Sequence, residues 1–220
     1  MPRSAALLSV AFVGMALVGC QVTAGDPATP PPSVEAPVPG ADVPDLIDTG
    51  QPLPAGRYTR TGFEPWIELE LDGTWQAVQL FDGFFDVQRN PGSPDVIAVQ
   101  FAKPGRIGGA DGAEMPSDAA AAVELVTANP ALTVIASSNS WINGLTGHQV
   151  TVANQSAAHA RILLVPPGPL GIEPGRSLRI AFFDTDAGLL AIMVGGSTAR
   201  WGEALAAAEP VLESVVIGRE

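Results

Sequence analysis

The chain has 220 residues, of which 46% are hydrophobic, and its 11 Lys and Arg against 23 Asp and Glu give a formal net charge of −12 at pH 7. A surface this acidic repels nucleic acid and anionic lipid headgroups, so we expect no nucleic-acid partner and permit neutral or cationic ones. A single cysteine is present. No disulfide can therefore form within the chain, and the fold has to be held by a hydrophobic core.

Residues 1–19 are typical of an export signal. Arg3 and the α-amino group precede Ala5–Val18, which is uncharged and apolar except for Ser9 and two small breaks. As a helix of about 14 residues, this run would reach roughly 21 Å, which is short of the ~30 Å hydrocarbon core of a bilayer. A permanent transmembrane helix is therefore disfavoured, and we interpret residues 1–19 as a removable signal peptide.

The end of this run, Leu17-Val18-Gly19-Cys20, resembles the lipobox of bacterial lipoprotein precursors. The resemblance implies cleavage between Gly19 and Cys20 and a diacylglycerol on the Cys20 sulfur. Two acyl chains give stable anchoring, where one alone is marginal. The expectation is an extracytoplasmic protein, lipid-anchored to the cell membrane on the cell surface or in the periplasm. The alternative is an ordinary secretory signal that is cut a few residues later.

Residues 20–54 are predicted to be a lipid-anchored, disordered tether. They are rich in proline, and their longest apolar cluster is Leu46-Ile47. Such a segment cannot bury enough apolar surface to offset the entropy lost on ordering. We therefore expect one globular domain over residues 55–220, which should fold on its own as a soluble monomer.

The first half of this domain is predicted to be a run of antiparallel strands. Apolar and polar residues alternate over 66–71, which is the period of a half-buried strand. Asp72-Gly73 and Asp82-Gly83 are strong hairpin-turn signals. The further strands expected in this half span 75–80, 84–88 and 95–101.

The second half is predicted to alternate between helix and strand. After an irregular, glycine-rich segment at 103–116, Ser117 is expected to cap a helix over 118–128. Strands are expected at 132–138, 147–154 and 160–165, with the last two paired around a turn at 155–158. Residues 166–175, with their prolines, are interpreted as a loop. Two strands then flank the turn at 184–188, Ser197 caps a helix over 198–213 that Pro210 should kink or split, and 215–217 forms a short strand.

This order of elements predicts an α+β fold, an antiparallel β-sheet flanked by two main helices. The phrases "GTWQAVQLFDGFFDVQR", "ANPALTV", "INGLTGHQVTV" and "AEPVLESVVI" resemble the lipoprotein branch of the PsbP-like superfamily. The resemblance implies an α/β/α sandwich and a binding or accessory role, and it brings no catalytic residues to this chain. The proline-rich loop at 166–175 departs from the family layout and is expected to widen or cover a groove.

Few residues suggest a binding site. We expect the glycine-rich loop at 105–112 and the proline-rich loop to form groove edges, through Gly108, Gly109, Asp111, Pro167 and Pro169. Aromatic residues form a second candidate surface, although such residues more often belong to the core: Trp75, Phe81, Phe84, Phe85 and Trp141.

Metal-binding and catalytic patterns are weak. The predicted strand pairing separates His148 from His159, so a shared zinc site is not expected. Asp111, Glu114 and Asp118 cluster without EF-hand spacing, which leaves calcium as a minor alternative. The sequence "GGSTA" at 195–199 lacks the last glycine of a nucleophile elbow, and Asp184 and Asp186 are typical of a turn.

The function predicted from the sequence is therefore a membrane-anchored, non-enzymatic binding or accessory protein. It needs no metal or cofactor, and its partner is an envelope protein or a small ligand. Catalysis by a nucleophile or an acid–base pair needs an activating neighbour. Since carboxylates are the only plentiful group of that kind, the alternative is an envelope-acting hydrolase or transferase with a carboxylate site.

Overall fold

The structure is a computed structural model that describes residues 43–108, 114–166 and 168–218. Among these residues, no helix combines the length and the apolar character needed to cross a bilayer. The elements in chain order are β1 (Gly56–Thr59), β2 (Ile67–Leu71), β3 (Gln76–Phe81), β4 (Phe84–Arg89), β5 (Ile97–Ala102), β6 (Arg106–Ile107), α1 (Ala119–Thr127), β7 (Leu132–Ile142), β8 (Leu145–Asn154), β9 (Ala160–Val165), β10 (Gly168–Ile172), β11 (Arg176–Thr185), β12 (Gly188–Ser197), η1 (Thr198–Arg200), α2 (Trp201–Ser214) and β13 (Val216–Ile217).

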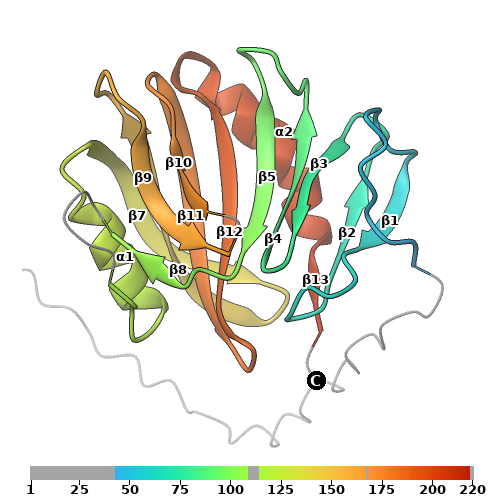
Figure 1. Ribbon diagram of the computed structural model, residues 1–220, viewed down its shortest axis with the longest axis horizontal. Coiled ribbons are helices and arrows are strands. Elements are labelled where there is room, and N and C mark those ends of the chain that lie inside the picture. The colour runs from blue at the N-terminus through green and yellow to red at the C-terminus, as the bar shows by residue number, and fades with distance from the viewer. Residues whose placement is uncertain (1–42, 109–113, 167, 219–220) are drawn as a thin grey trace, which may run out of the picture. The chain divides into compact units, whose positions relative to one another are not determined.

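A seven-stranded sheet in the order β3-β4-β5-β12-β11-β8-β7 forms the centre of the domain (Figure 1). All its neighbouring strands run antiparallel. β11 shows why both faces of this sheet are covered: Ile180 and Phe182 belong to one buried cluster, whereas Ala181 and Phe183 belong to another. Successive side chains of a strand point to opposite faces, so an almost continuously apolar strand needs a covering layer on each side.

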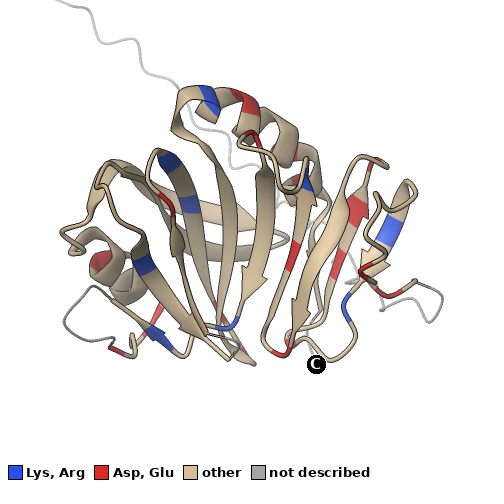
Figure 2. Cartoon of the chain, turned by 45° about the horizontal axis from the view of Figure 1, so that its top comes forward, with Lys and Arg blue, Asp and Glu red and all other residues tan. Residues whose placement is uncertain are grey.

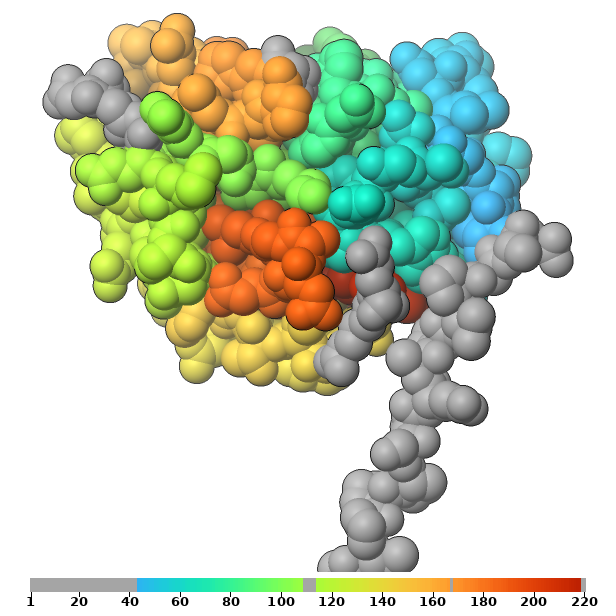
Figure 3. All heavy atoms as spheres, turned by 60° about the horizontal axis from the view of Figure 1, so that its bottom comes forward, coloured from blue at the N-terminus to red at the C-terminus, as the bar shows by residue number. Residues whose placement is uncertain are grey.

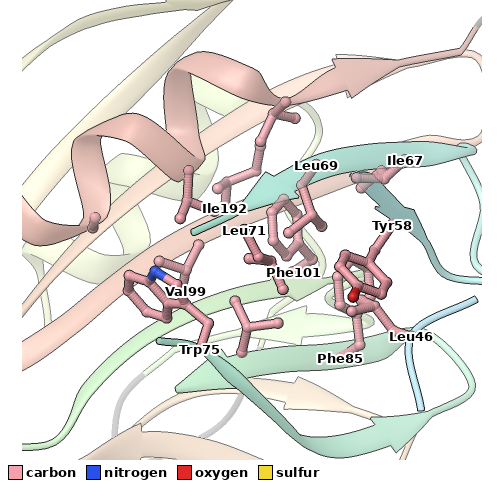
Figure 4. Close-up of a cluster of buried hydrophobic side chains, with 14 of the residues drawn as sticks. Leu46, Tyr58, Ile67, Leu69, Leu71, Trp75, Phe85, Val99, Phe101 and Ile192 are labelled. Atoms are coloured by element: carbon pink, nitrogen blue, oxygen red, sulfur yellow. The ribbon is translucent and has the colours of Figure 1, made fainter. Parts of the chain in front are cut away.

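The first face is covered by α2 and by a three-stranded sheet in the order β1-β2-β13. Its core contains a stacked pair, Phe85 and Phe101, with ring centroids 4.5 Å apart. Phe63 meets Phe85 edge-on at 4.9 Å. Figure 4 shows this cluster, in which side chains of the small sheet meet those of the central sheet.

The second face is covered by α1 and by another three-stranded sheet in the order β10-β9-β6. The α+β class, the antiparallel central sheet and the two helices are thus confirmed. The flanking layers differ from those of a simple α/β/α sandwich, because each consists of one helix beside one small sheet.

Residues 43–54, assigned above to the tether, belong to the folded domain. Leu46 and Leu53 are 1% and 4% exposed and lie in the first core cluster. The Leu46 amide donates to the Thr59 carbonyl at 2.7 Å, and the Leu53 amide donates to that of Trp75 at 2.8 Å. The domain boundary expected at residue 55 is therefore too late. Leu46 and Leu53 are isolated in a proline-rich stretch, so the sequence shows no repeating apolar pattern from which their burial could be predicted.

The expected pairing of 147–154 with 160–165 is wrong. β8 pairs with β7 and β11, whereas β9 pairs with β6 and β10 in a different sheet. The chain changes sheet at Asn154, whose buried side-chain amide donates to the carbonyls of Ala158 and Ile172, both at 2.8 Å. A buried amide that bonds both carbonyls fixes the bend and prevents a simple hairpin.

The loop expected at 166–175 contains a strand, β10, at the edge of its sheet. An edge position tolerates Pro169 because a proline there loses no ladder hydrogen bond on the outer side. Gly171 is needed here, since a Cβ at this position would lie 2.0 Å from the Ala160 carbonyl oxygen. β1 and β6 are two further short strands that the sequence did not predict.

The helix starts also differ from expectation. Asp118, not Ser117, caps α1, because its carboxylate accepts from the Ala121 amide at 2.8 Å while Ser117 donates to Asp118. Ser197 stands at the N-cap position of η1 but makes no capping hydrogen bond. α2 runs through Pro210 without splitting. Proline costs that helix one hydrogen bond, to the Ala206 carbonyl, and burial of Ala208 and Val211 holds the helix on both sides of it.

The buried carboxyl group of Asp86 predicts an unusual pH dependence. It accepts hydrogen bonds from the Gln79 amide at 2.8 Å and from Gln88 Nε2 at 2.6 Å, yet burial raises its pKa above the ordinary value of 3.8. A carboxyl group whose pKa is higher in the folded than in the unfolded state stabilises the folded state when it is protonated. This stabilisation is fully present below the unfolded-state pKa, and it is lost as pH rises through the folded-state pKa.

Relative to Asp86→Asn, the natural protein should therefore lose unfolding free energy as pH rises from about 3.8. Urea unfolding of both proteins across pH 3.5–7 measures the difference. Parallel pH profiles for the two proteins would show that Asp86 is not perturbed.

A candidate binding groove

A groove of about 790 Å³ lies on the first face of the central sheet, between α2 and the β7 end. It exists because α2 packs on β12, β5 and β2, while the central sheet continues past β12 through β11, β8 and β7. The strands beyond α2 therefore expose part of this face. We refer to this hollow as the α2–β7 groove.

Four apolar side chains form most of the floor of the α2–β7 groove. Ala181 and Phe183 of β11 and Ile192 and Val194 of β12 line it. These side chains point to this face because they alternate with the residues of the second core cluster. An apolar floor favours a ligand that has an apolar body.

The wall formed by α2 follows helical periodicity. Its lining residues recur at intervals of three and four, as expected for one face of a helix: Gly202, Leu205, Ala206, Glu209, Leu212 and Glu213. Leu205 and Leu212 therefore extend the apolar lining from the floor onto this wall. The carboxylates of Glu209 and Glu213 lie in the C-terminal half of the same helix.

Polar side chains surround the rest of the groove. Asn139, Ser140 and Asn143 of the β7–β8 hairpin lie at its margin, whereas Gln149 of β8 and Arg179 of β11 extend the floor, in register with Ala181 and Val194. The Arg179 Nε atom is buried and has no hydrogen-bond partner among the described residues. Gln149 Nε2 donates to Ser138 Oγ at 2.9 Å. The groove thus offers amides, a hydroxyl, carboxylates and a guanidinium for hydrogen bonds to a ligand.

Trp141 gives the groove an aromatic margin. It lies near the tip of the β7–β8 hairpin, its side chain is 72% exposed, and it lines the α2–β7 groove. Of the predicted aromatic surface, Trp75, Phe84 and Phe85 are instead core residues, and Phe81 is exposed on β3. The prediction of a single aromatic surface patch is therefore wrong, and of its five members only Trp141 lines the groove.

A smaller hollow of about 230 Å³ separates the tips of two hairpins. Figure 3 shows these tips on one face, the β7–β8 hairpin in yellow beside the β11–β12 hairpin in orange. Asp184 and Asp186 line this hollow with Asn143. The Asp184 carboxylate accepts from the Ala119 amide at 3.1 Å and so holds the start of α1, which is a structural role.

Of the predicted groove edges, the two described residues, Gly108 and Pro169, lie away from the α2–β7 groove. The other predicted groove edges, Gly109, Asp111 and Pro167, and the predicted cleavage and lipidation residues, Gly19 and Cys20, lie outside the described residues. Gly108 follows β6 and Pro169 lies on β10, and the two strands pair with opposite edges of β9. Their small sheet packs on the second face, and neither residue lines the α2–β7 groove.

The described residues contain no group of three or more His, Cys, Asp and Glu that could hold a metal ion. His148 lies on β8, whereas His159 precedes β9 with its Nε2 4.0 Å from Glu173 Oε1. Two of the residues considered as calcium ligands have structural roles instead: Asp118 caps α1, and the backbone of Glu114 pairs with that of Ile107.

Compared with models of known protein families and with the sequences of curated proteins, the chain shows no match. Among solved structures, cyanobacterial PsbP (CyanoP) from Synechocystis sp. PCC 6803 is similar at 14% identity, a TM-score of 0.42 and coverage of 74% of this chain and 92% of that one. LpqN, involved in cell envelope biogenesis of Mycobacterium tuberculosis, is similar at 11% identity, a TM-score of 0.41 and coverage of 78% and 88%. Likeness at this level assigns neither a ligand nor a function.

Sequence reasoning missed the groove, although the sequence contains two signals of it. Arg179 interrupts the otherwise apolar run "LRIAFF" of β11. A single charge in a strand buried on both sides indicates that the sheet is uncovered at that point. The mixed face of α2, leucines alternating with glutamates, is a second such signal.

Proposed function

We propose that this protein is a lipid-anchored binding protein of the cell envelope, and that the α2–β7 groove binds an amphipathic ligand. The observation that carries the proposal is the combination of a mostly apolar floor with hydrogen-bonding groups around it in one groove of about 790 Å³. Small-molecule sites have this composition, with a few placed polar groups that orient a mostly apolar ligand. The ligand fitted by this groove has an apolar body and a polar, hydrogen-bonding end.

The groove is better suited to binding than to chemistry. None of the described residues that line it is a histidine or a cysteine, the groups most often used as a general base or as an activated nucleophile. The carboxylates of Glu209 and Glu213 keep open the alternative of an envelope-acting hydrolase or transferase. Turnover of cell-wall glycan, esters or peptides by the purified protein, abolished by Glu209→Gln, would establish that alternative.

A groove-filling variant tests the binding proposal. A Cβ at Gly202 would meet no atom within 4 Å, so Gly202→Trp should fill the groove without disturbing α2, while Gly202→Ala leaves it open. We expect the neutral apolar dye N-phenyl-1-naphthylamine to bind the natural protein and Gly202→Ala with similar affinity. Gly202→Trp should weaken binding at least tenfold, as measured by dye fluorescence. Equal binding by all three proteins would remove the groove as the site.

The anchor is proposed from the lipobox resemblance. Cys20 is the only cysteine, so Cys20→Ser should abolish acylation and release the protein from the membrane or leave its precursor uncut. Metabolic labelling with a palmitate analogue, followed by fractionation, measures this loss. Label that persists on Cys20→Ser would contradict the anchor, and a full-length protein in which Ser9→Ala is the only change serves as the control.

A further inference from the structure

β7 is a free edge of the central sheet. Among the described residues it pairs only with β8, and it forms one end of the strand order. It is 11 residues long, against a usual strand length of about five or six. Figure 1 shows β7 on the outer side of the sheet, next to α1.

This edge is exposed and uncharged. Every residue from Thr133 to Asn139 is exposed, including Val134 and Ile135 at 43% and 52%. The strand reads LTVIASSNSWI and contains no charged residue and no proline. Natural sheets blunt such edges with charges, prolines, β-bulges or covering segments, because the unpaired amides and carbonyls accept another strand. β7 has only one of these devices, a bulge between Val134 and Ala136.

The other sheet edges in the described residues are shorter, and several are paired or carry a proline. β3, at the other end of the central sheet, is also uncharged, but it is only 6 residues long, and its pairing with β4 is interrupted between Ala77 and Leu80. Residues Pro44–Leu46 pair with β1 at Thr59. β6 bonds to Glu114, and β10 carries Pro169. β7 is the longest of these edge strands, and it carries neither a charge nor a proline.

We propose that β7 is a docking strand for an extended, basic segment of another protein, which adds to the central sheet as an eighth strand. In this mode of binding, main-chain hydrogen bonds give affinity and alternate side chains give specificity. The exposed Ile135 and Trp141 favour β-branched or other apolar side chains opposite them. The net charge of −12 favours lysine or arginine at the flanks of the added segment.

The same charge argues against a second copy of this chain as the occupant. Each copy carries −12, so pairing through β7 would bring two strongly acidic domains together. Figure 2 shows that the acidic residues occur in many parts of the domain.

Three synthetic peptides test the proposal on the purified soluble protein. The first is a capped nonapeptide of alternating Thr and Val or Ile with lysine at both ends. In the second, glutamate replaces both lysines, and in the third, proline replaces the central residue. Binding is followed by NMR amide shifts and by hydrogen exchange of residues 133–139. The basic peptide should slow exchange along β7 at least tenfold, and the acidic and proline peptides should bind at least tenfold more weakly.

Matched variants locate the contact. Ser137→Lys adds a charge to the exposed edge and should weaken binding of the basic peptide at least tenfold, while Met115→Lys, at an apolar residue 75% exposed and outside β7, should not. Val134→Lys repeats the edge test if Ser137→Lys does not fold. Absence of protection on β7, equal binding by the edge variants, or a dimer in sedimentation that Ser137→Lys dissolves would each overturn the proposal.

Discussion

Cutting the chain before residue 55 should severely destabilise the domain, whereas cutting it before residue 43 should not. Leu46 and Leu53 are buried in the first core cluster. Figure 4 labels Leu46 in that cluster together with Tyr58 and Phe85. Removing a buried leucine side chain costs about 2–5 kcal/mol. Loss of both leucines therefore removes about 4 kcal/mol or more, a large share of the roughly 5–15 kcal/mol that holds a typical domain folded.

Urea unfolding of fragments 43–220 and 55–220 measures this difference. A pair of point variants separates burial from chain length: Leu46→Ala should cost about 2–5 kcal/mol, and Ile47→Ala, at a side chain 56% exposed, should stay within about 0.5 kcal/mol. Identical unfolding midpoints for the two fragments would show that residues 43–54 do not contribute to the core.

Gly147→Ala should be the most damaging single methyl addition in the central sheet. A Cβ at this position of β8 would lie 2.2 Å from the Phe182 carbonyl oxygen and 2.6 Å from Phe183 Cδ1. Neither the backbone of β11 nor the buried Phe183 ring can move without disturbing both core clusters. Overpacking of this kind costs about 3 kcal/mol.

Thermal unfolding of Gly147→Ala against Gly202→Ala provides the comparison. At Gly202 the added methyl meets nothing and lies in a helix, so Gly202→Ala should stabilise the protein by up to about 1 kcal/mol. Since Phe183 also lines the α2–β7 groove, Gly147→Ala should weaken dye binding as well. Similar melting temperatures for both variants would contradict the close packing of β8 against β11.

Local signals in the sequence predicted most elements but not their partners. The Asp72-Gly73 and Asp82-Gly83 turns and the alternation over 66–71 correctly placed β2, β3 and β4. The predicted pairing of β9 with β8 was wrong. A connection as short as 155–158 can form a hairpin, but it can also carry the chain from one sheet into another. Only the buried Asn154 amide decides between the two, and its burial is a property of the folded state.

The candidate site was less predictable than the fold. The α2–β7 groove combines one face of α2 with strands β7, β8, β11 and β12, and its position depends on how far α2 extends across the sheet. Glycine- and proline-rich segments drew attention to Gly108 and Pro169 because loops often line sites. Arg179 carried the better signal, a charge inside an apolar strand.

The central claim, that the α2–β7 groove is the binding site, is tested most directly by NMR mapping. An isotope-labelled soluble domain is titrated with a lipid and peptide extract of its native envelope. We predict that the perturbed amides cluster on the groove, at Gln149, Ala181, Phe183, Leu205 and Glu209, and that Gly202→Trp suppresses these changes. Perturbation confined to the small sheet on the second face, around Gly108 and Leu170, with Gly202→Trp unaffected, would contradict it.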